Sequence, residues 1–66
     1  MALPAPVVRR LIREQAGLSQ REIGDVLGVT AAAVSQYETG SRDPGRQVRD
    51  KYVALLDSLQ REVLAG

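Results

Sequence analysis

Apolar residues recur at helical spacing in several segments of this 66-residue chain, with polar residues between them. The pattern predicts an all-α fold of about four helices, formed as one domain over residues 1–66. A first helix is expected to begin at Pro6 and to stop at Gly17, because proline suits a first helical turn and glycine the residue after a helix. A long amphipathic helix is expected over residues 44–64, with Asp43 as its N-cap.

Residues 18–40 are predicted to contain two short helices that cross steeply. Ser19 and Glu22 form an S-x-x-E capping box at the start of the first helix, and Thr30 is the N-cap candidate of the second. Only the three residues Gly-Val-Thr separate the two helices, which is too short a connection for an antiparallel pair. Glycine has no side chain, so Gly24 allows the two helices to approach each other closely where they cross. The segment is therefore predicted to be a helix-turn-helix.

The second of these helices, residues 31–39, has two unlike faces when it is phased at about 100° per residue. Val34 and Tyr37 point toward the core. The opposite face is small and nearly uncharged, which suits close approach to base-pair edges. The residues expected to contact bases are Ala31, Ala32, Ser35, Gln36 and Thr39. An inert alanine-rich helix in a small all-α domain is the alternative interpretation.

The segment LSQREIGDVLGVTAAAVSQYETG resembles the Cro/repressor-type helix-turn-helix family of phage and bacterial regulators. The resemblance covers about residues 7–44, and it implies a DNA-binding domain that places residues 31–39 in the major groove. It also implies an ion pair between Arg13 and Glu38, and a contact from Gln20 to the DNA backbone. The long helix over residues 44–64 departs from the family, which commonly has two short helices there.

The charge distribution favours a double-stranded DNA partner although the net charge is only +1. Residues 22–40 contain acidic but no basic side chains, and basic residues flank this segment on both sides. Cations on either side of a recognition helix are suited to clamp the two backbones of a groove. The residues expected to contact phosphates are Gln20, Thr30, Ser41, Arg42 and Arg46.

Cysteine and histidine are absent, and the chain has no P-loop, so neither a metal site, a cofactor nor enzymatic activity is expected. No apolar run approaches the length of a membrane span, and the N-terminus lacks a signal-peptide core. We therefore expect a cytoplasmic protein without membrane contact.

The long helix carries an apolar stripe whose proximal part, from Val48 to Leu55, is expected to cover the first helix. At about 1.5 Å per residue the helix is roughly 30 Å long, so its distal part is expected to extend beyond the body of the domain. Leu56, Leu59 and Val63 are therefore predicted to form a homodimer interface that serves a palindromic operator. Burial of the whole stripe in the protein's own core is the alternative.

These features together predict a sequence-specific regulator of transcription, with repression as the expected direction. Two other functions remain open at the sequence level, because a fold does not determine a function. One is an accessory DNA-binding protein of a phage or mobile element, acting in excision or immunity. The other is a protein-binding module on the same fold, such as an antitoxin-like partner or an anti-repressor.

Overall fold

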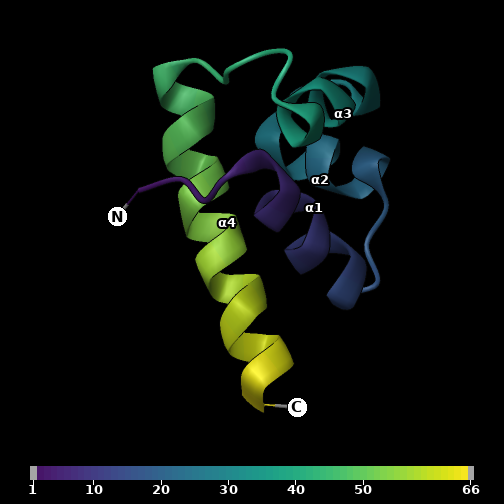
Figure 1. The fold of residues 1–66 in the computed structure, drawn as a ribbon, viewed down its shortest axis with the longest axis vertical. Coiled ribbons are helices and arrows are strands. Elements are labelled where there is room, and N and C mark those ends of the chain that lie inside the picture. Colours follow the sequence, from purple (N-terminus) through teal and green to yellow (C-terminus); the bar gives the residue numbers. More distant parts are fainter. Residues whose placement is uncertain (1, 66) are drawn as a thin grey trace.

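The computed structural model describes residues 2–65, which form four α-helices and no strand. The predicted all-α fold is confirmed. Figure 1 shows the first three helices gathered on one side of the fourth, with the N-terminal segment crossing the fourth helix before the first begins. The helices are α1 (Pro6–Gln15), α2 (Gln20–Leu27), α3 (Ala31–Thr39) and α4 (Arg46–Ala65). No helix within residues 2–65 is long and apolar enough to cross a membrane.

Local capping fixes where α2 and α3 begin, as the sequence predicts. The Glu22 backbone N–H donates to the Ser19 hydroxyl over 3.0 Å, and the Ser19 N–H donates to the Glu22 carboxylate over 2.9 Å. At the start of α3, the Ala33 N–H donates to the Thr30 hydroxyl over 3.1 Å. Each bond satisfies an N–H that has no partner inside its helix.

The close crossing of α2 and α3 depends on Gly24. This residue is buried, and a Cβ atom at its position would lie 2.6 Å from the carbonyl oxygen of Val29. The connection between the helices turns at Gly28, whose φ of 75° is in the left-handed region that favours glycine. A side chain at position 24 would therefore push the turn away from α2.

The core lies where the three short helices meet α4. The side chains of Tyr37 and Tyr52 pack with their ring centroids 6.0 Å apart, which joins α3 to α4. The largest fully buried side chains are Tyr52, Ile23, Leu27, Leu56 and Val34. All four helices thus contribute to one cluster, since Ile12 of α1 belongs to it as well.

The structure corrects the predicted start of the last helix. We expected helix from residue 44 with Asp43 as the N-cap, but α4 begins at Arg46, and the Arg49 N–H donates to the Gly45 carbonyl over 2.8 Å. The residue before a proline is disfavoured in helical conformation, and glycine is a poor helix former. These two effects keep residues 43–45 in the loop.

The structure also corrects the predicted dimer interface. Leu56 and Leu59 are only 1% and 8% exposed and belong to the core of their own chain, whereas Val63 is 38% exposed. The body of the domain reaches further along α4 than expected, because Ala16 and Leu18, which follow α1, pack against the same core. On α4 the buried core residues therefore continue from Tyr52 through Leu56 to Leu59. Leu56 and Leu59 are therefore not available to a partner.

Candidate DNA interface

The helix α3 presents a small, uncharged face to the surface. Its inward side is closed by the buried residues Ala33, Val34, Tyr37 and Glu38. All five residues that the sequence assigned to base contacts lie on the other side. Of these, Ala32, Gln36 and Thr39 are exposed, and Ala31 and Ser35 are partly buried. The structure therefore brings the predicted base-contact residues together on one helix face.

Hydrogen bonds hold the last turn of α3 and the loop that follows it. The Thr39 hydroxyl donates to the Gln36 carbonyl over 3.2 Å and lies 3.0 Å from the Ser41 hydroxyl. The Arg42 backbone N–H donates to the same Gln36 carbonyl over 3.4 Å. These bonds keep Ser41 and the exposed Arg42 at the end of α3, beside the candidate base-contact face.

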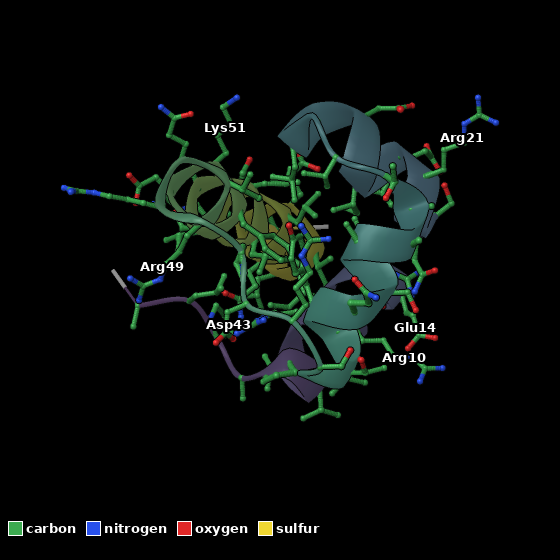
Figure 2. All side chains as sticks on the ribbon, turned by 90° about the horizontal axis from the view of Figure 1, so that it is seen from above. Arg10, Glu14, Arg21, Asp43, Arg49 and Lys51 are labelled. Atoms are coloured by element: carbon green, nitrogen blue, oxygen red, sulfur yellow. The ribbon has the colours of Figure 1, made fainter. Side chains whose placement is uncertain are left out.

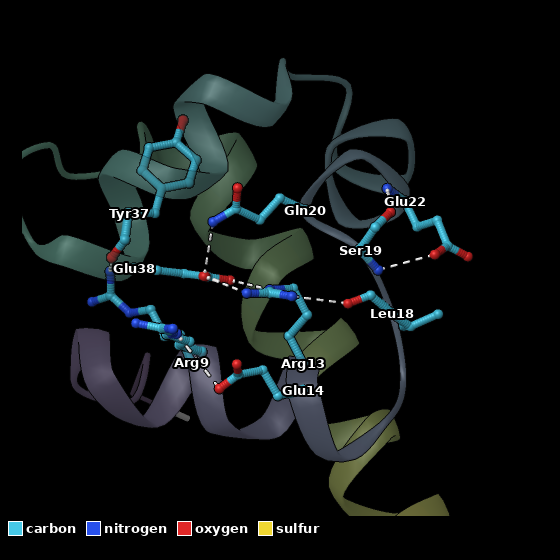
Figure 3. A network of polar contacts seen from close by, with 10 residues as sticks. Arg9, Arg13, Glu14, Leu18, Ser19, Gln20, Glu22, Tyr37 and Glu38 are labelled. Carbon is cyan, nitrogen blue, oxygen red and sulfur yellow. Dashed lines mark hydrogen bonds and ion pairs between the residues drawn. The ribbon is translucent and has the colours of Figure 1, made fainter.

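Arg13 of α1 and Glu38 of α3 form the expected ion pair, which Figure 3 shows from close by. The Arg13 Nε and Nη2 atoms donate to the two oxygens of Glu38 over 2.6 and 2.9 Å, and Nη1 donates to the Leu18 carbonyl over 2.9 Å. The hydrogen bonds to Glu38 raise the pKa of Arg13 above its usual value. The pair therefore ties α3 to α1 with a fixed fork geometry.

Gln20 joins this network from the first turn of α2. Its side-chain amide donates to a Glu38 oxygen over 3.2 Å (Figure 3). The predicted phosphate contacts Gln20 and Thr30 stand at the N-terminal ends of α2 and α3, where backbone N–H groups have no partner inside the helix. Arg46 is exposed at the start of α4, beyond the loop.

Arg9 has a role that the sequence reasoning missed. The residue is 7% exposed, its Nε donates to the Pro4 carbonyl over 2.7 Å, and its Nη1 donates to the Tyr37 carbonyl over 2.9 Å. The Tyr37 carbonyl belongs to the last turn of α3, where carbonyls lack partners inside the helix and cations are favoured. Arg9 thus caps the C-terminal end of α3. No local pattern marks it, because one of its partners is 28 residues away.

The sequence reasoning also did not single out Arg10, which lies beside α3 (Figure 2). Its guanidinium lines a surface hollow with Gln20, Ser35 and Thr39 and is paired with Glu14 one turn along α1, at 3.5 Å. The other two arginines of α1 are bound inside the domain. Arg9 donates to the Pro4 and Tyr37 carbonyls, and Arg13 donates to Glu38. Arg10 is therefore the arginine of α1 that is placed to meet a ligand bound at α3.

Within residues 2–65, no group of three or more acidic, histidine or cysteine side chains is placed to hold a metal ion. A family model described as helix-turn-helix matches residues 10–59, which include α2, α3 and the greater part of α4. The match thus continues beyond residue 44, where the sequence resemblance was expected to end. No curated protein and no solved structure gave a significant match to the chain.

Proposed function

Because this chain belongs to the Cro/repressor-type helix-turn-helix family, we propose that it binds specific sequences of double-stranded DNA with α3 in the major groove and so regulates transcription. The family is one of DNA-binding regulators and not of enzymes. The observation that carries the proposal is the outer face of α3, which is uncharged and is left uncovered by the other helices. A solvated face without a binding role usually carries lysine and glutamate.

Gln36 is the main reader of sequence in this proposal. Its exposed amide can donate to and accept from the edge of an adenine at once, and such a bidentate pair discriminates by about 1–3 kcal/mol. The methyl groups of Ala31 and Ala32 suit apolar contact with thymine methyls. Ser35 and Thr39 lie along the same face and supply hydroxyls for neighbouring bases.

The proposal assigns contacts with the DNA backbone to residues at the starts of three helices and in the loop after α3. Gln20 and Thr30 offer the N-terminal ends of α2 and α3 to phosphates, and Ser41 and Arg42 do so from the loop after α3. Arg46 follows on α4. Contacts of this kind set the register of the protein on the duplex and make the affinity dependent on salt, but they do not read sequence.

The experiment is a selection from random duplexes, followed by binding measurements on the selected site. Gln36→Ala should relax preference at one base pair, and Ala32→Glu should abolish binding, because it places a carboxylate against the DNA. Gln60→Ala is the matched control, since Gln60 is an exposed glutamine on α4, away from α3. If both α3 variants bind the selected site as wild type does, α3 is not in the groove.

Regulation is expected to be repression, because a protein bound across a promoter excludes the polymerase. A reporter gene placed behind the selected site tests this direction. A homodimer on a palindromic site remains a prediction. Its interface does not include Leu56 or Leu59, because both are buried in their own chain. Sedimentation of the protein with and without the duplex tests whether the dimer forms. Failure to bind any duplex would favour the protein-binding module instead.

A further inference from the structure

A polar hollow of about 220 Å³ opens beside the candidate base-contact face. It lies where α1, the first turn of α2 and the outer face of α3 meet, and the close view in Figure 3 shows its inner wall, formed by Arg13, Gln20 and Glu38. Its remaining lining residues are Arg10, Ser35 and Thr39. Any duplex that places its major groove on α3 brings a backbone strand along this side of the helix.

The charges around the hollow differ in how firmly they are paired. Glu38 and Arg13 neutralise each other through two short hydrogen bonds, and their side chains are 2% and 13% exposed. Arg10 is different, because its side chain is 61% exposed and its partner Glu14 is outside the hollow and 48% exposed. Exposed pairs of this kind are weakly held. Arg10 is therefore the lining charge that can change partner.

We propose that this hollow binds a phosphate of the DNA backbone and that Glu14 competes with that phosphate for Arg10. The proposal rests on the DNA-binding function proposed above. A guanidinium presents its N–H groups as a fork that fits one carboxylate or one phosphate. A neutral donor is available beside it, since the Gln20 amide uses one N–H for Glu38 and has a second.

Glu14 then tunes the affinity for DNA without contacting it. When Arg10 moves from Glu14 to a phosphate, one ion pair is exchanged for another, and the Glu14 carboxylate is left unpaired near a polyanion. Part of the attraction of Arg10 for the duplex is lost in this exchange. A protein without the Glu14 charge should therefore bind more tightly.

The test compares Glu14→Gln, Arg10→Ala and the double variant for binding to a duplex of arbitrary sequence, about 20 base pairs long, over a range of salt. Glu14→Gln should bind about three- to fivefold more tightly. Arg10→Ala should bind about three- to fivefold more weakly, with a log–log salt slope shallower by about 0.9 per bound subunit. In the Arg10→Ala background, Glu14→Gln should change the affinity by less than about 1.5-fold, because the competition no longer exists.

Asp57→Asn is the matched control. Asp57 pairs with Arg61 at 2.7 Å with the same spacing along a helix, on the part of α4 that is distant from α3 (Figure 1), and its substitution changes the charge by the same amount. It should alter binding by less than about 1.5-fold.

An equal gain from Asp57→Asn and Glu14→Gln, or a gain from Glu14→Gln that persists in the Arg10→Ala background, would show a general charge effect and overturn the competition. If wild type binds and all variants match it, the phosphate site is wrong while the DNA-binding function stands. If wild type binds no duplex, both proposals fail.

Discussion

The ion pair between Arg13 and Glu38 should be the polar contact on which the free energy of unfolding depends most. Substitution Arg13→Met removes both guanidinium bonds to Glu38, at 2.6 and 2.9 Å, while keeping an apolar side chain of similar length. The Glu38 carboxylate then loses its main partner at a position where its side chain is only 2% exposed to water. It keeps only the weaker 3.2 Å hydrogen bond from Gln20. A carboxylate in this position is costly to keep ionised.

The magnitude follows from the burial of the two partners. Removing one member of a buried pair typically costs about 3–5 kcal/mol. Arg13 retains 13% exposure, so water reaches the pair from one side, and we expect the lower end, about 3 kcal/mol. A domain of this length has a total stability of about 3–10 kcal/mol. The substitution should therefore remove about 30% or more of the stability.

The assay is urea denaturation followed by helical circular dichroism, without DNA. The double variant Arg13→Met with Glu38→Leu should recover most of the loss, because a buried ion pair can be replaced by apolar side chains at little net cost. Arg61→Met is the control, since it breaks a pair whose arginine is 77% exposed and whose Asp57 is 27% exposed, and it should cost less than about 1 kcal/mol. If Arg13→Met costs no more than Arg61→Met, or if the double variant costs the sum of its two single changes, the reasoning is refuted.

Two further predictions concern the core. Gly24→Ala should destabilise the domain by about 1–3 kcal/mol despite the better helix propensity of alanine, because the new Cβ meets the Val29 carbonyl at 2.6 Å; a variant that denatures at higher urea than wild type would contradict this. Burial raises the pKa of Tyr52 to about 12 from its ordinary value of 10.0, so the folded state favours the neutral hydroxyl. The resulting stability is fully present below pH 10.0 and lost as the pH rises through about 12, and Tyr52→Phe should abolish this alkaline loss in thermal denaturation followed against pH. Since the Tyr52 hydroxyl has no hydrogen-bond partner among residues 2–65, Tyr52→Phe should not lower the stability at neutral pH, and a loss there would count against the reasoning.

The features that the sequence predicted well are those whose causes lie within a few residues. Ser19 and Glu22 are three positions apart, and Thr30 and the N–H that it caps are equally close. Gly24 could be assigned to the crossing because only three residues separate the two helices. The phase of α3 follows from its own apolar spacing, which is why its inward and outward sides were both predicted.

The features that the sequence did not predict depend on distant segments. Arg9 is indistinguishable from its neighbour Arg10 in a local pattern, yet one is buried against the end of α3 and the other is exposed. The burial of Leu59 depends on how far the turn after α1 reaches along α4, and helical periodicity along α4 carries no information on that distance. The apolar stripe of α4 was predicted correctly, but Leu56 and Leu59 pack in the core of their own chain and not against a second copy.

Contacts within the protein hold α3 at both of its ends, without any DNA. Thr30 caps its first turn, Arg9 binds the Tyr37 carbonyl of its last turn, and Glu38 anchors it to α1. A helix fixed in this way has little conformational entropy left to lose when it enters a groove. In the proposed complex, the difference in affinity between two DNA sequences therefore arises at the base edges and in the deformation of the duplex, and not in the ordering of α3. In that complex the buried network around Glu38 would support specificity by holding α3 in place, although it would read no base itself.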